Sequence, residues 1–527
     1  MVISAHALAT EAGLEVLRDG GNAVDAAIAV HWALAVVAPW AGNIGGGGFL
    51  LFRSSDKAVH SLDFRETAPK ASTPDMFATG PDHLEGRARQ VGHLACGVPG
   101  SVAGMYALRD SLGSLPMERL MRPALDLARI GFELTEADAH DLNAKLELLR
   151  SASTRPNAFI SRPKWSAGDR LIQPDLYATL ERICRNGPSE FYTGQTAELI
   201  LAEMARGKGV MTKEDLANYK AVWREPIQGE YRGLRIHCMG PPSGGGIILL
   251  QVLKTMELLD VAAMGCLKAA TVHSMVEAER RAYADRAQYL GDPDRSTIPT
   301  DWLLSAGHIA QRMSDINPKK ATPSAHISRG IPVKESEQTT HFSIVDGYGN
   351  AVSCTTTLNG SYGCGVVVGK AGFVLNNEMA DFSSEGIRVD ERVGAKDPNR
   401  IGPGKRMLSS MTPTIITKND ELYMVLGSPG GTTIPTAVLQ TVMNVVDHGQ
   451  SPTEAVSTGR FHHQWRPDSI RVEPQAIAVA DSVELVRMGH TIVCRPPMGR
   501  VNLIKVDAHG NLEAGVDPRG DDAAGGF

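Results

Sequence analysis

Residues 336–359 of the chain read SEQTTHFSIVDGYGNAVSCTTTLN, and this stretch decides which fold we expect. Two runs with polar and apolar residues in alternation, TTHFSIVD and AVSCTTTLN, flank the loop DGYGN. Alternation on both sides of a short glycine-containing turn is typical of a β-hairpin. We therefore predict two antiparallel strands joined by the three residues 347–349.

The length of this loop determines which residues of the hairpin face each other. A three-residue loop places Asp346 opposite Asn350, and the same register places Thr339 opposite Thr357. Side chains alternate between the two faces of a strand. The hydroxyl-rich face carries Thr339, His341, Ser343, Ser353, Thr355, Thr357 and Asn359, and the mainly apolar face carries Thr340, Phe342, Ile344, Val352, Cys354, Thr356 and Leu358. Thr339 is thus directed toward a polar site and Thr340 toward packing, whereas a loop one residue longer would exchange them.

Segments with the apolar spacing of helices occur along the chain on either side of several further predicted strands. Apolar spacing predicts a helix over ALATEAGLEVLRDGG, which ends at Gly20-Gly21, and a second helix over residues 22–37. The run NIGGGGFLLF predicts a turn entering a strand, and HSLDFRETAP is its partner strand. MTPTIIT and ELYMVLG form a second hairpin around a turn at 418–420, followed by the glycine-rich GSPGG and a long amphipathic helix. This mixture predicts an α+β fold of packed sheets covered by helical layers.

Composition excludes several classes of protein. A net charge of −6 and a pI near 6.3 over 527 residues give no electrostatic footprint for nucleic acid or a membrane surface. The seven cysteines contain no CxxC pair, so we expect buried thiols in a reducing compartment. The segment AVDAAIAVHWALAVVAP is interrupted by Asp25 and His31 and predicts a buried helix, not a membrane span. No signal peptide is predicted, so we expect a cytoplasmic protein if Met1 is the true start and a periplasmic one if the start has been lost.

A threonine hydroxyl needs a base before it can act as a nucleophile. No Ser-His-Asp set is evident, and GPPSGGG at 240–246 lacks the G-x-S-x-G spacing. If the backbone is cut between Gln338 and Thr339, the freed α-amine, with an ordinary pKa of about 8, becomes the base beside its own hydroxyl. Residues 318–337 have no periodicity and predict an exposed loop in which such a cut can occur.

Other candidate sites are weaker. Gly430 and Gly431, in GSPGG before a helix, can offer backbone N–H groups to an oxyanion, although a plain turn is the commoner role of such a pair. No P-loop occurs, and GCGVVVG lacks the dinucleotide-binding spacing. His462 and His463 lack a carboxylate at ligand spacing and are interpreted as structural, and His341 as a hydrogen-bonding residue of the polar face. We expect no metal and no cofactor.

Long motifs occur along the chain in the order found in one enzyme family. They are GGNAVDAAIAV, AGNIGGGGFLL and LDFRETAP upstream, then ESEQTTHFSIVDGYGNAVSCTTTLN, GFVLNNEMADFS, GKRMLSSMTPT, GSPGG and FHHQW. With these motifs the chain resembles the gamma-glutamyltranspeptidases over nearly its whole length. The resemblance implies a four-layer αββα sandwich of the N-terminal-nucleophile hydrolase type, with two stacked antiparallel sheets. It also implies self-cleavage between Gln338 and Thr339 into a large subunit, 1–338, and a small catalytic subunit, 339–527, intertwined in one globular unit.

The resemblance also implies a role for each site residue. Thr339 would attack the γ-glutamyl amide of glutathione or a related compound, helped by Thr357, and pass the glutamyl group to water, an amino acid or a peptide. Gly430 and Gly431 look like the oxyanion-hole residues. Arg65, Ser409 and Ser410 would hold the α-carboxylate of the substrate, and Asn359, Glu378 and Asp381 its α-amino group. Such a zwitterion suits a guanidinium with two hydroxyls on one side and paired acids on the other.

Two alternatives remain beside this function. One is a glutaryl-type (cephalosporin) acylase of the same family, whose substrate lacks the α-amine that Glu378 and Asp381 would hold. The other is an unprocessed binding protein on the same fold, which the presence of Thr339 and Thr357 argues against. Residues 384–404, where the family has a lid over the site, contain no tyrosine or other aromatic residue, so donor closure and acceptor preference are left open.

Overall fold

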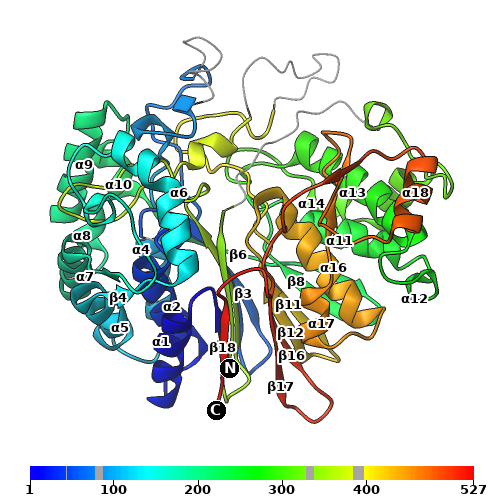
Figure 1. Ribbon diagram of the computed structural model, residues 1–527, viewed down its shortest axis with the longest axis horizontal. Helices are drawn as coiled ribbons and strands as arrows, with labels where there is room; N and C mark the ends of the chain where they lie inside the picture. Colours follow the sequence, from blue (N-terminus) through cyan, green and yellow to red (C-terminus); the bar gives the residue numbers. More distant parts are fainter. Residues whose placement is uncertain (43, 78–86, 328–337, 384–396) are drawn as a thin grey trace.

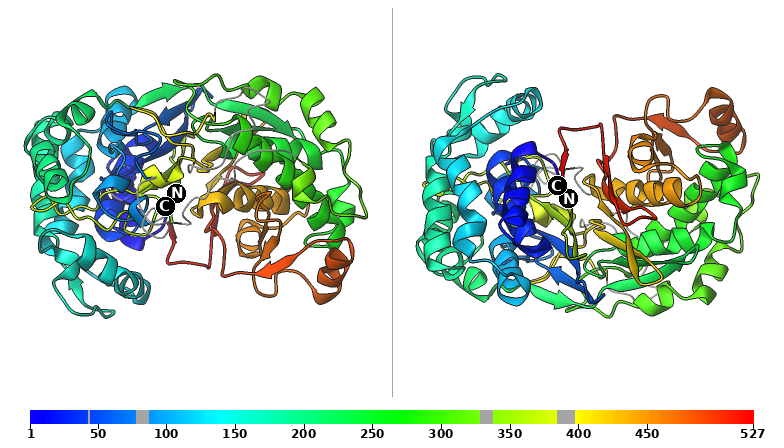
Figure 2. Two further views of the ribbon diagram at one scale, coloured as in Figure 1. Left: turned by 90° about the horizontal axis from the view of Figure 1, so that it is seen from above. Right: turned by 90° about the horizontal axis from the view of Figure 1, so that it is seen from below.

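Two β-sheets lie face to face between two layers of helices (Figure 1). The computed structural model describes residues 1–42, 44–77, 87–327, 338–383 and 397–527. Views from above and below show one group of helices outside each sheet (Figure 2). The predicted α+β fold, a four-layer αββα sandwich, is confirmed.

Both large sheets are antiparallel and contain strands from both sides of residue 338. The first has the order β18 (Ala523–Gly525), β1 (Val2–Ser4), β9 (Thr340–Val345), β10 (Ala351–Thr357), β2 (Gly47–Arg53), β3 (Val59–Asp63) and β6 (Val222–Arg224). The second has the order β17 (Leu512–Val516), β16 (Asn502–Val506), β12 (Glu421–Gly427), β11 (Thr414–Lys418), β8 (Leu234–Cys238) and β7 (Ile227–Tyr231). Two small sheets pair β4 (Phe132–Glu133) with β5 (Arg170–Leu171), and β13 (Phe461–His462) with β14 (Ile470–Val472) and β15 (Ile492–Cys494).

The two helical layers come from successive parts of the chain. The first contains α1 (Ala7–Arg18), α2 (Ala23–Val37), α4 (Ser101–Leu112), α5 (Met117–Ile130), α6 (Glu136–Ala152), α7 (Pro174–Asn186), α8 (Ser189–Tyr192), α9 (Gln195–Gly207) and α10 (Lys213–Asn218). The second contains α11 (Gly245–Met256), α12 (Val261–Met264), α13 (Ala269–Tyr289), α14 (Thr300–Leu303), α15 (Ala306–Met313), α16 (Ile434–Val446), α17 (Pro452–Ser457) and α18 (Val479–Arg487). Each layer closes its own apolar core against one sheet.

Helix α2 is the buried helix that the sequence predicts. Asn22 caps its first turn, and Asp25 completes a capping box with the Asn22 backbone, which satisfies N–H groups that the helix itself cannot bond. Every residue of α2 is buried. Among the described residues, no helix is long and apolar enough to cross a membrane.

The β9–β10 hairpin has the predicted register. Val345 lies opposite Ala351, and Thr340 opposite Thr356. Its apolar face packs in the core of the first helical layer. Its hydroxyl-rich face lies against the second sheet, where Ser343 donates to a backbone carbonyl of β16 (3.0 Å) and Ser353 to one of β12 (2.9 Å). Polar groups therefore join the two sheets along this hairpin.

The second hairpin differs from its prediction in the turn. The sequence suggested a loop at 418–420, but Lys418 pairs with Glu421, so that only Asn419 and Asp420 form the loop. Both loop residues have positive φ, 53° and 65°. A two-residue loop with this geometry matches the twist of the strands, whereas a three-residue loop is the less common choice.

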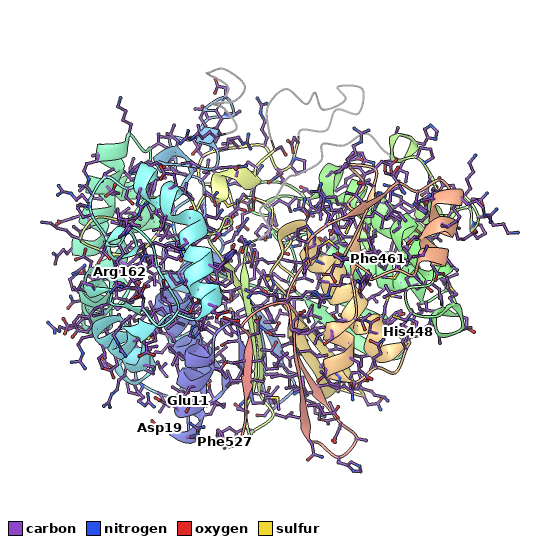
Figure 3. The ribbon with its side chains drawn as sticks, in the orientation of Figure 1. Glu11, Asp19, Arg162, His448, Phe461 and Phe527 are labelled. Atoms are coloured by element: carbon purple, nitrogen blue, oxygen red, sulfur yellow. The ribbon has the colours of Figure 1, made fainter. Side chains whose placement is uncertain are left out.

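The two chain ends lie together at the edge of the first sheet (Figure 1). β18 pairs with β1, and Figure 3 labels Phe527 at the chain end together with Glu11 of α1 and Asp19, the residue that follows this helix. The Arg18 guanidinium lies 5.6 Å from the centre of the Phe527 ring. Of the loop predicted at 318–337, residues 318–327 are mostly exposed, with a short 3₁₀ turn, and the remainder lies outside the described residues.

The glycine run before β2 allows close contact with β10. A Cβ atom at Gly46 would lie 2.1 Å from the backbone oxygen of Thr357, and one at Gly48 would lie 2.4 Å from that of Thr355. β2 follows the run as the partner of both β3 and β10, as the sequence predicts for β2 and β3. Glycine is thus required because the two backbones leave no space for a side chain.

The substitution Gly46→Ala tests this contact. We expect it to lower the free energy of unfolding by about 1–3 kcal/mol, because the added methyl group must displace β10 at Thr357. Gly347→Ala in the β9–β10 turn is the matched control, since a Cβ there meets no atom within 4 Å. Chemical denaturation of the two variants should separate them clearly; equal losses would contradict the proposed crowding at Gly46.

Candidate active site

Thr339 lies immediately before β9, opposite the last residue of β10. It is buried, and its Oγ1 lies 3.5 Å from Oγ1 of Thr357. Thr340 points away from this site into the first layer, and within the described part of the chain its hydroxyl has no hydrogen-bond partner. The structure therefore separates the two adjacent threonines as the strand alternation predicts.

The Thr357 hydroxyl connects the nucleophile candidate to the peptide bond that precedes it. It donates to the backbone oxygen of Gln338 at 3.1 Å and accepts from the backbone N–H of Asn359 at 2.7 Å. Because a hydroxyl has only one proton, the hydrogen bond with Thr339 must be donated by Thr339. This arrangement polarises the Gln338 carbonyl and holds the Thr339 oxygen beside it.

A hydrogen-bonded path leads from this pair to a buried cluster of charges. The Asn359 side-chain amide donates to Asp381 at 3.0 Å, and the other Asp381 oxygen lies 2.6 Å from the Arg65 guanidinium. Asn359 adopts a left-handed backbone conformation, with φ at 70°, which costs energy for a residue other than glycine. The predicted residues Thr339, Thr357, Asn359, Asp381 and Arg65 therefore form one continuous chain of contacts.

The Arg65 guanidinium contacts three carboxyl groups, those of Glu66, Glu378 and Asp381. It lies 2.7 Å from Glu378 and 3.6 Å from Glu66, and the Arg65 side chain is 1% exposed. Burial by itself lowers the pKa of Arg65, but the nearby negative charges outweigh burial and raise it. Burial raises the pKa of Glu66 to about 8 against the opposing effect of Arg65, so Glu66 is largely protonated at neutral pH.

The predicted serine pair lies next to this cluster. Arg65 donates to the backbone oxygens of Met407 (3.4 Å) and Leu408 (3.3 Å), which directly precede Ser409. Ser409 accepts from a backbone N–H at 3.1 Å, whereas the Ser410 hydroxyl is buried without a hydrogen-bond partner in the described ranges. A buried hydroxyl of this kind favours binding of a polar ligand group.

A cavity of about 210 Å³ lies beside the peptide bond between Gln338 and Thr339. Gln338, Thr339 and Gly430 all line it. Gly430 and Gly431 have φ of 133° and 55°, which other residues rarely adopt, and they lead through a short 3₁₀ turn into α16. Gly430 thus lines the same cavity as Thr339, and Gly431 follows Gly430 directly in the chain.

The histidines singled out in the sequence are buried and hydrogen-bonded. His341 contacts Thr355 (2.9 Å) and Ser343 (3.1 Å), and burial lowers its pKa to about 3, so it is neutral. His462 and His463 bond to different neighbours, and burial also lowers their pKa values, to about 3 and about 4. These contacts fit the structural interpretation of all three residues.

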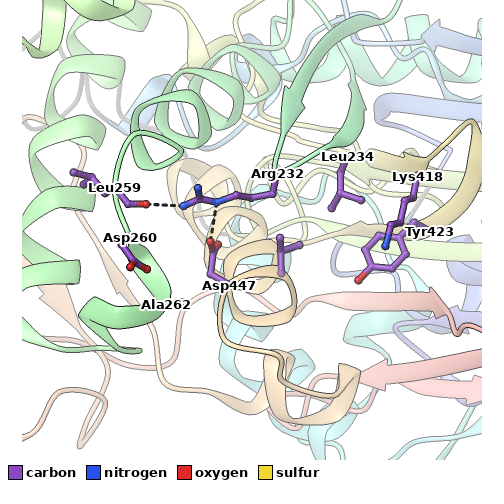
Figure 4. A pocket seen from close by; sticks show the side chains of 9 residues that line it. Arg232, Leu234, Leu259, Asp260, Ala262, Lys418, Tyr423 and Asp447 are labelled. Atoms are coloured by element: carbon purple, nitrogen blue, oxygen red, sulfur yellow. Dashed lines mark hydrogen bonds and ion pairs between the residues drawn. The ribbon is translucent and has the colours of Figure 1, made fainter.

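A larger hollow of about 520 Å³ lies beside the β11–β12 turn and is lined by none of the predicted site residues (Figure 4). The Arg232 guanidinium in it lies 3.2 Å from Asp447 and donates to the backbone oxygen of Leu259 at 2.7 Å. The Arg232 guanidinium is therefore already bonded to the protein. The smaller cavity, which Thr339 lines, is therefore the candidate for catalysis.

Sequence reasoning missed three residues of the site. Glu66 follows Arg65 directly in the DFRETAP motif, and that adjacency is the only signal that could have suggested it. Trp40 and Arg500 line the cavity beside Thr339, but nothing in the sequence brings them to it. The lid expected at 384–404 lies outside the described residues over 384–396.

Sequence comparison places these features in a family. The gamma-glutamyltranspeptidase profile matches residues 9–527. The chain belongs to the gamma-glutamyltranspeptidase family. This membership confirms the predicted family and its enzyme class. The chain is 44% identical to the glutathione hydrolase proenzyme of Escherichia coli (strain K12) over 533 residues, covering 100% of this chain and 92% of that protein.

Solved structures of the family agree with the fold. The cephalosporin acylase from Bacillus halodurans superimposes with a TM-score of 0.86 at 28% identity, over 99% of this chain and 94% of that one. A chain of the Helicobacter pylori gamma-glutamyltranspeptidase gives a TM-score of 0.59 at 40% identity. That match covers 62% of this chain and 94% of the H. pylori chain.

The protonated Glu66 predicts a pH-dependent stability. Between its ordinary pKa of 4.5 and its folded pKa of about 8, the folded state retains a proton that the unfolded state has lost, so the stability falls as the pH rises. The slope is at most about 1.4 kcal/mol per pH unit. Glu66→Gln removes this contribution, and we expect the variant to gain stability relative to wild type between pH 5 and pH 8.

Denaturation curves at pH 5, 6.5 and 8 measure this difference. Thr339→Ala is used as the background for both proteins, so that each is studied as one chain. Glu230→Gln, at an exposed position of β7, is the control and should follow the wild type. If the stabilities of Glu66→Gln and of wild type changed equally with pH, this would show that Glu66 is ionised in the folded protein.

Proposed function

We propose that this family member is a self-processing γ-glutamyl hydrolase and transferase that acts on glutathione and related γ-glutamyl compounds. The observation that carries the proposal is the hydrogen-bonded path from Thr339 through Thr357 and Asn359 to the Arg65 cluster. It connects a hydroxyl nucleophile to a charged, buried site whose polarity suits a small zwitterion. The similarity to the Escherichia coli glutathione hydrolase proenzyme supports the same substrate class.

Maturation begins at the Gln338–Thr339 bond. Oγ1 of Thr339 attacks the Gln338 carbonyl carbon while the Thr357 hydroxyl stabilises the developing negative charge on the carbonyl oxygen. The C–N bond breaks, the hydroxyl proton passes to the new α-amine, and Gln338 is held as an ester. Water hydrolyses this ester, which leaves two subunits of 338 and 189 residues in the same folded unit.

The length of one related chain supports this cleavage position. The matched H. pylori chain covers 62% of the present sequence. Residues 1–338 are 338 of 527 residues, or about 64%. Cleavage after residue 338 would leave a large part of similar length.

In turnover the freed α-amine of Thr339 accepts the proton of its own hydroxyl. The oxygen attacks the γ-carbonyl carbon of the donor, and the amide C–N bond breaks. The leaving amine takes the proton, and the glutamyl group remains as an ester on Thr339. Water or the amine of an amino acid or peptide then attacks that ester. The C–O bond to Thr339 breaks, and the α-amine passes a proton from the attacking group to the Thr339 oxygen. Gly430 and Gly431 are the proposed donors to each oxyanion. The residues themselves supply every proton transfer, so no cofactor is required.

The charge balance of the buried cluster favours a γ-glutamyl group over a glutaryl group. With Glu66 protonated, the cluster contains one guanidinium and the two carboxylates Glu378 and Asp381. A glutamyl α-carbon carries an ammonium and a carboxylate and adds no net charge. A glutaryl group adds one uncompensated negative charge to a buried site, which is unfavourable. The acylase alternative is therefore the weaker one.

Cleavage is tested on a denaturing gel. Purified wild type should give two bands of about 36 and 20 kDa, in proportion to the 56.4 kDa chain. Thr339→Ala should remain a single band and be inactive, whereas Thr340→Ala should still be processed. A wild-type protein that stays intact while hydrolysing γ-glutamyl-4-nitroanilide would contradict the mechanism, and an intact, inactive wild type would favour the non-catalytic binding protein.

Donor selectivity is tested with γ-glutamyl- and glutaryl-4-nitroanilide. We expect the wild-type kcat/KM to be at least about tenfold higher for the glutamyl compound, the equivalent of about 1.4 kcal/mol. Asp381→Asn should lower this ratio, because it removes a carboxylate from the cluster, and Glu230→Gln should leave it unchanged. Faster turnover of the glutaryl compound would favour the acylase.

A further inference from the structure

The catalytic cavity contains two arginines besides the groups that act on the scissile bond. Arg500 and Arg519 both line its wall, together with Thr339 and Gly430. None of the residues predicted to hold the glutamyl group, namely Arg65, Asn359, Glu378, Asp381, Ser409 and Ser410, lines this cavity. The residues predicted to hold the glutamyl group are therefore separate from this cavity, which leaves the cavity for the amine half of an amide substrate.

The two arginines differ in how far the protein already neutralises them. Arg519 donates to both oxygens of Glu473 at 2.9 and 2.6 Å and to Asp517 at 3.0 Å, and two backbone oxygens also accept from it. Arg500 makes one ion pair within the described residues, with Asp522 at 3.6 Å, beyond hydrogen-bond distance. Arg519 has a structural role, whereas the Arg500 guanidinium retains its hydrogen-bonding capacity.

Arg500 is nevertheless held in place. Its guanidinium lies 4.8 Å from the centre of the Trp40 ring, and its backbone N–H donates to Ser428 at 3.0 Å. Its side chain is 19% exposed, so a ligand entering the cavity can reach it. A planar guanidinium that is stacked on an indole keeps a fixed orientation and presents paired N–H groups to a carboxylate.

We propose that Arg500 is a carboxylate-binding residue for the amine half of the reaction. It binds the C-terminal carboxylate of the peptide that leaves the γ-glutamyl donor, and the carboxylate of the amino acid or peptide that accepts the glutamyl group. One subsite serves both ligands, because attack by an acceptor amine on the ester is the reverse of departure of the leaving amine. This inference rests on the proposed γ-glutamyl transfer.

Two chromogenic donors isolate this interaction. γ-Glutamyl-3-carboxy-4-nitroanilide differs from γ-glutamyl-4-nitroanilide only by a carboxylate on the leaving aniline. Arg500→Gln should reduce the ratio of their kcat/KM values by about tenfold or more, the effect expected for loss of a charge-assisted hydrogen bond. The reduction should arise mainly from a higher KM for the carboxylated donor, and Arg500→Lys should restore part of the ratio.

Arg495→Gln is the matched control, because it removes the same charge from an exposed position outside the cavity. It should leave the ratio of the two donors unchanged. An unchanged ratio in Arg500→Gln as well would overturn the proposal. A loss of the same size for both donors would overturn it too, since it would point to damage of the whole site.

Binding without turnover separates this inference from the proposed function. Saturation-transfer NMR on the purified protein, without donor, compares glycylglycine with glycylglycinamide, which lacks the carboxylate. We expect wild type to bind glycylglycine about tenfold more tightly, and Arg500→Gln to bind both equally. Equal binding by wild type would overturn the subsite, whereas a preference in a protein inactive toward both anilides would support the subsite and contradict the proposed function.

Discussion

The antiparallel register of β9 and β10 is the constraint on which the active site depends. Ladder hydrogen bonds hold each strand residue opposite one partner, so the pairing of Thr340 with Thr356 leaves Thr339 beside Thr357 at the open end of the hairpin. A slip of one residue would turn Thr340 toward the site instead. The hairpin lies between β1 and β2, and its hydroxyl groups bond to the second sheet. Both neighbouring strands and the second sheet therefore stabilise this register.

The second determinant is the buried charge at Arg65. Removing a guanidinium and several carboxyl groups from water is unfavourable unless the charges pair. In this protein Arg65 forms ion pairs with Glu378 and Asp381, and the third acid, Glu66, is protonated. In the proposed function, the same cluster binds a substrate that carries both a positive and a negative charge. Asn359 connects this determinant to the first, because its backbone N–H bonds to Thr357 and its side chain to Asp381.

Local features of the sequence predicted the fold well. The loop length between the two runs of alternating residues determined the β9–β10 register, and the cap at Asn22 and the apolar run after it determined α2. The turn at Asn419 was misjudged by one residue, because the alternation does not show where a strand ends. The position of Arg500 beside Trp40 depends on contacts between distant segments, which spacing along the chain cannot indicate. The resemblance to a family supplied most of the predicted site residues, and the structure brings five of them into one path.

The interleaving of strands from either side of residue 338 has a consequence for the life of the molecule. Both sheets need both parts of the chain, so the proposed hydrolysis of the Gln338–Thr339 bond would leave the core intact and release neither part. Before that hydrolysis, folding is a reaction of a single chain. Afterwards, the recovery of an unfolded molecule requires two chains to meet, so it depends on their concentration. Cleavage would therefore make refolding to the native structure harder than the first folding of the single chain.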